Sequence, residues 1–426
     1  MSTHRDKFGR PVVAVTGLGI VTSLGQGRDD NWKGLTAGRS GVHAINRFST
    51  VGLRTTVAGT VDFLPRGDGS SPELSEQLAT LAADEAITMS GLGRKGDFPG
   101  ELFMAVPPVE VEWPDRLALA KASGREPADY DAMLAAAESG RFHVIHDRFM
   151  FGGVAERTAE RFGTKGSPIS LSTACSSGAT AIQLGVEAIR RGETQVALAI
   201  GTDGSVQAES LIRFSLLSAL STQNDPPQEA AKPFSKNRDG FVMGEGAGAL
   251  VLEDYDHALA RGAAIIGIVA GCGEKGDGFH RTRSSPDGRP AILAMQAAIV
   301  DAGLVPDQID YINAHGTSTP ENDKMECMSC RAVFGERMSR LPISSNKSMV
   351  GHTLTAAGAV EAVFSLLTIA HGRLPPTINY KLPDPAIELD VVPNVARDAK
   401  VRAVLSNSFG FGGQNTCLVF TAEPVS

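Results

Sequence analysis

Short β-branched runs alternate with longer Ala- and Leu-rich amphipathic runs along most of the chain. Apolar runs of about four to eight residues predict buried strands, and longer runs with a period of about 3.6 residues predict helices. The predicted strands are 12–16, 169–174, 196–200, 247–253, 309–314, 342–345, 401–406 and 416–421. The predicted helices are 74–90, 176–191, 291–302, 323–334 and 355–371. Alternation of this kind predicts an α/β protein with largely parallel or mixed buried sheets.

Three stretches interrupt this pattern. A charged stretch that ends in glycine, 254–262, is the best candidate for a boundary between two halves of the chain. Residues 106–150 begin with prolines and continue as a polar amphipathic stretch, which indicates an excursion inserted between core elements. The glycine-rich start 16–22 lacks the third glycine of a dinucleotide-binding fingerprint, so we interpret it as a structural strand followed by a turn.

Composition and charge argue against several classes of function. The chain has 426 residues, of which 42% are hydrophobic and 21% charged, as in ordinary globular proteins. A net charge of −8 argues against a nucleic-acid partner, because phosphate binding needs a basic surface. We see no signal peptide and no apolar run of about 18 residues that would span a membrane. Five cysteines form an odd and sparse set, which favours reduced thiols and a cytoplasmic protein.

Two motifs suggest metal binding but lack the necessary partners. Cys327 and Cys330 have the spacing of a metal or redox pair, yet they lie inside a helical pattern and no second pair completes a zinc site. His143 and His146 also lack matching thiolates or carboxylates. We therefore expect no metal site.

Cys175 has the setting of a nucleophile. It lies among small residues at the junction between a predicted strand and a long predicted helix, where a sharp turn exposes a side chain to substrate. The helix N-terminus would place backbone N–H groups beside the sulfur and favour the thiolate. A buried structural cysteine is the alternative interpretation.

Two histidines and a glycine-rich loop strengthen the case. His315 ends a predicted strand, and His352 lies between a strand and a helix. Both positions are strand ends, where α/β proteins place their sites. The loop 406–415 carries three glycines with Phe409 and Phe411, and it can bring backbone N–H groups to an oxyanion while its rings shape an apolar pocket. A simple tight turn would explain this loop as well.

These motifs together resemble the β-ketoacyl-[acyl carrier protein] synthases I and II, which are condensing enzymes. The motifs also occur in the order and with the separations of that family. The matching segments are 15–25, 172–178, 238–246, 315–323, 347–352 and 407–413.

The resemblance implies a thiolase-like α/β fold, in which two similar halves form five layers, αβαβα, and it implies a homodimer. The N-terminal half, 1–258, would carry the nucleophile, with the atypical segment 106–150 inside it. The C-terminal half, 259–426, would carry the catalytic histidines.

The resemblance also assigns roles to residues. The catalytic residues would be Cys175, His315, His352 and Lys347. The backbone N–H groups of Cys175 and Phe411 would form the oxyanion hole, with Phe411 acting as a gate. Substrate would contact Thr317, Thr319 and Phe409, and Glu326 would be a supporting residue.

The implied reaction suits these residue types. Cys175 would accept an acyl group from acyl carrier protein. The two neutral histidines would stabilise the enolate that decarboxylation of malonyl carrier protein leaves, and this carbanion would attack the acyl-cysteine. No metal or organic cofactor is expected, and the partner would be acyl- and malonyl-loaded acyl carrier protein.

Two features of the sequence depart from the family pattern, and two alternative functions stay open. Residues 106–150 do not look like the family's segment, and the acidic stretch 70–77 replaces a basic docking surface, which would leave Lys232, Lys236 and Arg238 to bind the carrier. A polyketide or specialised-lipid synthase would use the same residues. A non-catalytic partner subunit is the other alternative, although the presence of Cys175 argues against it.

Overall fold

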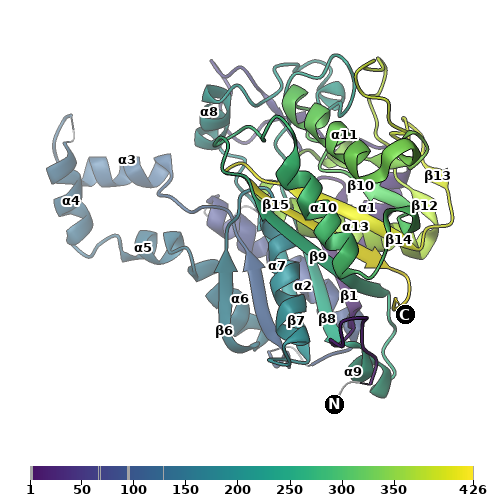
Figure 1. Ribbon diagram of the computed structural model, residues 1–426. Helices are drawn as coiled ribbons and strands as arrows, with labels where there is room; N and C mark the ends of the chain where they lie inside the picture. Colours follow the sequence, from purple (N-terminus) through teal and green to yellow (C-terminus); the bar gives the residue numbers. More distant parts are fainter. Residues whose placement is uncertain (1–2, 66, 68, 94–95, 128, 426) are drawn as a thin grey trace.

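The structure is a computed structural model that describes residues 3–65, 67, 69–93, 96–127 and 129–425, with strands and helices alternating along the chain (Figure 1). Its strands form two five-stranded arrays. The first array runs in the order β1 (Val13–Thr22), β8 (Gly246–Asp254), β7 (Val196–Asp203), β5 (Glu101–Ala105) and β6 (Lys165–Leu171). The second runs β9 (Gly267–Gly276), β15 (Gln414–Thr421), β14 (Ala403–Phe409), β10 (Tyr311–Asn313) and β11 (Ile343–Ser344).

The two arrays have the same topology. When the five strands of each are ranked along the chain, the order in both is first, fifth, fourth, second and third. Where β1 and β9 pair, at Ala14–Ile268 and Val15–Gly267, the arrays join into one sheet. The chain passes from one array to the other between β8 and β9, across the short helix α9 (Tyr255–Ala260).

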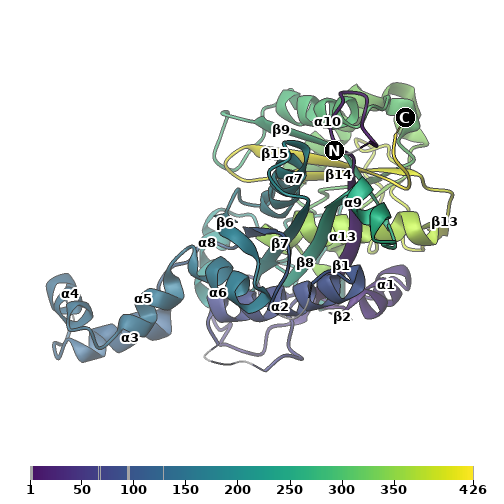
Figure 2. The same cartoon turned by 90° about the horizontal axis from the view of Figure 1, so that it is seen from below.

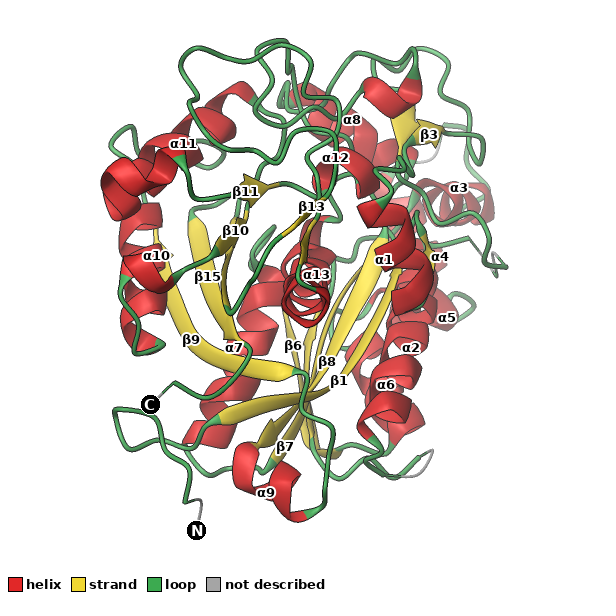
Figure 3. Ribbon diagram, turned by 90° about the vertical axis from the view of Figure 1, so that its right-hand side faces the viewer, coloured by secondary structure: helices red, strands yellow, loops and turns green. Residues whose placement is uncertain are grey.

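Helices cover both faces of each array. On the outer face of the first lie α2 (Ser71–Ser90) and α6 (Gly153–Phe162), and on the outer face of the second lie α10 (Arg289–Asp301) and α11 (Pro320–Phe334) (Figures 1 and 3). Between the arrays run α7 (Ser177–Arg190) and α13 (Ala357–His371). These five layers confirm the fold that the resemblance implies.

The remaining elements are short or peripheral. The short strands are β2 (Gly25–Gln26), β3 (His43–Ala44), β4 (Val57–Ala58), β12 (Arg373–Leu374) and β13 (Arg397–Asp398). The other helices of the body are α1 (Arg28–Thr36), α8 (Ala208–Leu216), α12 (Lys347–Val350), η1 (Pro227–Glu229), η2 (Pro306–Gln308), η3 (Gly335–Ser339) and η4 (Leu354–Ala356).

The two central helices cross at glycines. A Cβ on Gly178 would lie 2.5 Å from the backbone N of Ala359, and a Cβ on Gly358 would lie 2.4 Å from that of Ala179. Only glycine permits this approach, because the partner at each point is backbone that cannot move aside. The crossing fixes the start of α7, and therefore Cys175, against the C-terminal half.

Two sequence expectations are wrong. The segment 16–22 is no turn but part of the continuous strand β1, and its glycines face α2, where a Cβ on Gly19 would lie 1.8 Å from the carbonyl oxygen of Ala82. One described segment, Leu354–His371, is long and apolar enough by composition to cross a membrane, which the sequence analysis missed. Of this window, 83% is buried inside the fold, as in the core helix of a folded domain.

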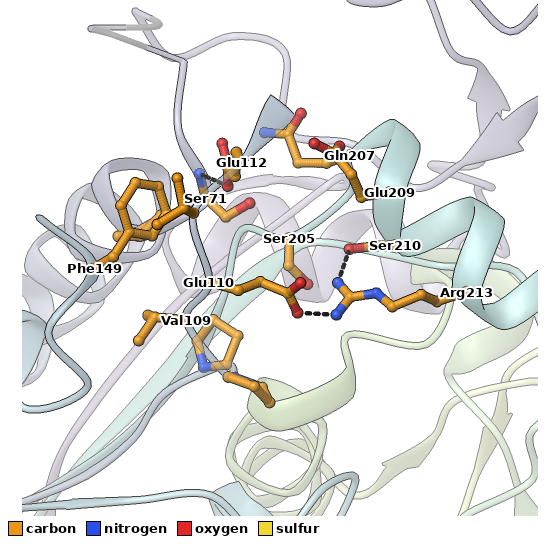
Figure 4. Close-up of a pocket in the computed structure, with 14 residues that line it drawn as sticks. Ser71, Val109, Glu110, Glu112, Phe149, Ser205, Gln207, Glu209, Ser210 and Arg213 are labelled. Carbon is orange, nitrogen blue, oxygen red and sulfur yellow. Dashed lines mark hydrogen bonds and ion pairs between the residues drawn. The ribbon is translucent and has the colours of Figure 1, made fainter. Parts of the chain in front are cut away.

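The segment 106–150 forms an arm of three helices that projects from the body (Figures 1 and 2). The helices are α3 (Trp113–Ala122), α4 (Tyr130–Glu138) and α5 (His143–Phe149). At the base of the arm, Glu110 pairs with Arg213 of α8, and Glu112 accepts a hydrogen bond of 2.8 Å from the backbone N of Ser71 (Figure 4). These contacts close a small pocket that contains none of the predicted catalytic residues.

Candidate active site

A cavity of about 760 Å³ lies where the two halves meet. It brings together seven of the predicted site residues, which come from segments far apart in the sequence: Cys175, His315, Thr317, Thr319, His352, Phe409 and Phe411. Lys347 and Glu326, the other two predicted residues, are buried but do not line the cavity.

Cys175 lies at a tight backbone turn. Ala174 before it has a φ of 51°, a left-handed conformation that is uncommon for a residue with a Cβ, and α7 begins two residues after the cysteine. The turn places Cys175 in the cavity wall, and only 7% of its surface is exposed.

The Cys175 thiol is neutral in this structure. Burial raises its pKa to about 11, although a hydrogen bond from the backbone of Phe411 and the charge of Lys347 oppose this shift. Loss of hydration therefore outweighs the groups that favour the thiolate. The position of the Phe411 N–H beside the sulfur is the one an oxyanion donor requires.

His315 and His352 form a buried pair with aromatic neighbours. Their ring centroids lie 5.4 Å apart, Phe241 meets the His352 ring edge-on at 5.3 Å, and Phe409 meets the His315 ring at 5.6 Å. Burial lowers the pKa of both histidines well below the usual value, and the nearby Lys347 lowers it further. Both rings are therefore neutral at physiological pH.

The hydrogen bonds of His352 define its tautomer. Its Nδ1 accepts a hydrogen bond of 3.3 Å from the backbone N of Leu354, so the neutral ring carries its proton on Nε2. That Nε2, and Nδ1 of His315, are buried without a hydrogen-bond partner in the part of the chain that the structure describes. Unpaired buried polar atoms are costly, and both of these belong to residues that line the cavity.

Lys347 and Glu326 hold His315 through its backbone. Lys347 Nζ donates a 2.7 Å hydrogen bond to the carbonyl oxygen of His315 and pairs with the buried Glu361. Glu326 accepts hydrogen bonds of 2.8 and 2.7 Å from the backbone N atoms of His315 and Gly316. Both residues thus hold the backbone of His315 in position without lining the cavity themselves.

The two threonines lie on one wall of the cavity. Their hydroxyl oxygens are 2.9 Å apart, and Thr319 also caps α11 by accepting a hydrogen bond from the backbone N of Asn322. Hydroxyl groups held at the entry to a helix can bind a carboxylate or a carbonyl. This is the property that the predicted substrate contact needs.

Sequence reasoning missed three supporting groups. Glu361 balances Lys347, and Asn407 donates a 3.1 Å hydrogen bond to Glu326. Asp203, at the end of β7, accepts a 2.8 Å hydrogen bond from the Thr355 hydroxyl beside the His352 loop. The sequence does carry a signal for Glu361, since it is the one carboxylate in a helix of mainly apolar residues.

The three basic residues predicted to bind the carrier do not form an exposed surface patch. Lys232 is 5% exposed and its amine donates to Gln223. Arg238 is enclosed between Asp384, at 2.7 Å, and Asp323, at 3.5 Å. Only Lys236 of the three is exposed, so the charges that the sequence assigned to carrier binding mostly serve the fold.

Comparison with known proteins agrees with this geometry. The β-ketoacyl synthase N-terminal domain family matches residues 10–258, across the whole arm, and the C-terminal domain family matches residues 266–381. A putative polyketide β-ketoacyl synthase 1 of Streptomyces cyaneus is 37% identical over 96% of this chain and 97% of its own length. The 3-oxoacyl-[acyl-carrier-protein] synthase 2 of Coxiella burnetii is 37% identical over 96% and 98%.

A solved structure shows the same relationship. A ketosynthase of a type II polyketide synthase, solved in complex with its acyl-carrier protein, superimposes with a TM-score of 0.85 at 31% identity, covering 97% of this chain and all of the other. The N-terminal match covers the whole first array, and the C-terminal match covers β9, β10 and β11 of the second array. The cavity lies where the two halves meet. The chain therefore belongs to the β-ketoacyl synthase family.

Proposed function

We propose that the protein is a 3-oxoacyl-[acyl-carrier-protein] synthase that elongates an acyl chain by decarboxylative condensation. The observation that supports this most strongly is the shared cavity, in which one thiol faces two neutral histidines. Seven of the nine predicted site residues line it, and the other two hold His315 in place.

The first half-reaction acylates the thiol. The Cys175 sulfur attacks the thioester carbonyl of acyl carrier protein, the oxyanion accepts hydrogen bonds from the backbone N–H groups of Cys175 and Phe411, and the carrier thiol leaves. The cysteine proton must leave during this step because the resting thiol is neutral. The carrier thiolate that leaves takes up this proton, so the half-reaction is neutral overall.

The second half-reaction forms the carbon–carbon bond. Malonyl carrier protein loses CO₂, and the electron pair of the broken bond becomes an enolate whose oxygen is stabilised by N–H donors of His315 and His352. The enolate carbon attacks the acyl-cysteine carbonyl, and the Cys175 thiolate leaves and takes up a proton to restore the resting thiol. The products are 3-oxoacyl carrier protein, CO₂ and free enzyme.

Two features guide the choice of partner and pathway. The edge strand β6 and the exposed apolar side chains on the arm favour a homodimer, and relatives of this kind act on substrates carried by acyl carrier protein. We place the enzyme in the cytoplasm. Relatives from fatty-acid and from polyketide synthesis are equally similar at 37% identity, so a polyketide ketosynthase is the second candidate. Cys175 sets both candidates apart from a non-catalytic partner subunit.

Mass spectrometry tests the reaction class. After incubation with acyl carrier protein, the acyl group should be on Cys175, and Cys175→Ala should neither be acylated nor condense. His315→Ala and His352→Ala should accept acyl groups but condense about 10²–10³-fold more slowly, since each removes an oxyanion-type donor. Label on Cys272 or Cys417, or condensation at the normal rate by either histidine variant, would contradict the proposal. The chain length made in a reconstituted assay would separate fatty-acid from polyketide synthesis.

A further inference from the structure

One wall of the cavity mouth is formed by the loop of residues 277–286. Asp277 closes this loop by accepting hydrogen bonds of 2.7 Å from the backbone N and from the hydroxyl of Ser285. The loop is also attached to the turn that carries Phe411, because Gly412 N donates to the carbonyl oxygen of Arg281 at 2.8 Å. The loop therefore lies beside the predicted gate, with its backbone hydrogen-bonded to the same turn.

This loop carries two exposed arginines without a partner. Arg281 and Arg283 both line the cavity that contains Cys175. Neither has an ion pair or a side-chain hydrogen bond with any residue that the structure describes. In contrast, Arg190 and Arg261 lie 2.8 and 2.7 Å from carboxylates. Two unpaired cations on one loop at the cavity mouth form no ion pair that would stabilise the fold, so their placement indicates an anionic ligand.

The carboxylates of the cavity do not neutralise the two arginines. Asp239 accepts a 2.7 Å hydrogen bond from the Ser221 hydroxyl and a 3.0 Å one from the backbone N of Thr222. Glu321 lies on α11 and is accompanied there by Lys324, which also lines the cavity. The mouth thus has a local positive excess although the chain has a net charge of −8.

We propose that Arg281 and Arg283 bind the phosphodiester of the prosthetic arm on which the carrier presents its acyl group. This inference rests on the proposed function, since that function requires a phosphopantetheine thioester to reach Cys175. The planar guanidinium group matches phosphate oxygens in a two-pronged geometry. With the phosphate held at the mouth, the arm enters the cavity and its thioester reaches the sulfur.

The test compares three thioesters of the same acyl group: acyl-pantetheine, acyl-phosphopantetheine and acyl carrier protein. The measurement is kcat/KM for acylation of Cys175 in the wild type and in the Arg281→Gln/Arg283→Gln variant. Loss of charge-assisted hydrogen bonds should lower kcat/KM about 10–100-fold for both phosphate-bearing thioesters and leave acyl-pantetheine unchanged. Arg289→Gln is the matched control, because Arg289 is an exposed arginine at the start of α10 that does not line the cavity. We expect it to behave as the wild type.

Two outcomes would overturn the proposal. An equal loss with acyl-pantetheine would mean that the arginines do not recognise phosphate. A loss with acyl carrier protein alone would mean that they contact carboxylates of the carrier instead.

A binding experiment separates this inference from the proposed function. Phosphopantetheine without an acyl group should slow iodoacetamide alkylation of Cys175 in the wild type, and should do so much less in the double variant. If this protection is seen while no thioester acylates the enzyme, the phosphate site stands and the proposed reaction fails. If protection is identical in the two proteins, the phosphate site is wrong whatever the enzyme catalyses.

Discussion

At the residue scale, the reactivity of Cys175 depends on its hydration. The structure places the thiol in an almost buried wall, with a pKa of about 11. The folded state therefore favours the neutral thiol, and its contribution to the free energy of unfolding is present below the ordinary thiol pKa and lost as the pH rises toward 11.

This gives a prediction for alkylation. Because the thiolate is the reactive species, the rate of Cys175 carbamidomethylation by iodoacetamide should rise about tenfold per pH unit from pH 7 to 9. The measurement is peptide mass spectrometry of the labelled protein over time. Cys272, whose pKa burial raises to about 12, serves as an internal reference that should label more slowly. A rate that levels off near pH 7 would show that the resting cysteine is already ionised.

The pair of Lys347 and Glu361 supports the site from the protein interior. Both side chains are almost completely buried, and each compensates the charge of the other. Burial raises the pKa of Glu361, and Lys347 acts in the opposite direction. Removing one member leaves the other charge without compensation in a region that water does not reach.

We therefore expect Glu361→Leu to lower the free energy of unfolding by about 3–5 kcal/mol. Urea unfolding followed by circular dichroism measures the change. Glu229→Leu is the control, since Glu229 forms an exposed pair with Lys381, and exposed pairs contribute about 0–1 kcal/mol. Similar losses of unfolding free energy in the two variants would mean that burial does not increase the contribution of the Lys347–Glu361 pair to stability.

At the scale of elements, the position of the nucleophile depends on how closely α7 and α13 approach. A Cβ on Gly358 would lie 2.8 Å from the Cβ of Ala179, as well as against backbone. The helices would have to separate, and the start of α7 would shift with them.

Gly358→Ala should accordingly destabilise the protein by about 1–3 kcal/mol, as overpacking does, and should slow acylation of Cys175. Gly276→Ala provides the comparison, because a Cβ there meets no atom within 4 Å. Thermal unfolding and the acylation rate should both be near wild type for Gly276→Ala. If Gly358→Ala is equally neutral, the helices do not depend on this contact.

At the scale of the whole molecule, β6 is an edge strand and the arm beside it is rich in exposed apolar side chains. β6 pairs with β5 alone in the described sheet, and Ile169 on it is 44% exposed. The apolar side chains on the arm are Trp113, Leu117, Tyr130, Leu134 and Val144, all of them exposed. Exposed edges and large apolar patches of this kind mark protein interfaces.

We expect the protein in solution to be a dimer formed through this face, and Ile169→Asp to weaken it. A charge at the strand edge would be buried without a partner in the interface. Analytical ultracentrifugation should show twice the mass of the chain for the wild type and a shift toward the monomer for the variant. Val51→Asp, at a residue that is 92% exposed, should leave the dimer intact. A monomeric wild type would contradict the expectation.

The sequence by itself determined the elements and the identity of the reacting groups. Periodicity located most strands and helices within a few residues, because burial of one face imposes the pattern. It missed β9, because glycines give no hydrophobic signal. A Cβ on Gly271 or Gly273 of this strand would lie 2.2 Å from the carbonyl oxygen of Ala298 or Ala294. The nucleophile and both histidines were recognisable because their small, polar flanking residues have no role in a simple core.

Only the tertiary structure decided whether Cys175 is ionised, which buried charges hold the site in place, and which basic side chains are exposed. The pKa of Cys175 depends on how much water the folded wall excludes, which no local motif specifies. Glu361 pairs with Lys347 because α13 runs between the two arrays, so the pair joins segments that the sequence does not place together. Lys232 and Arg238 look like surface charges in the sequence and are buried in the fold, whereas Arg281 and Arg283 are exposed at the cavity mouth. Burial is a property of the packed chain, and it decides which charges stabilise the fold and which meet a ligand.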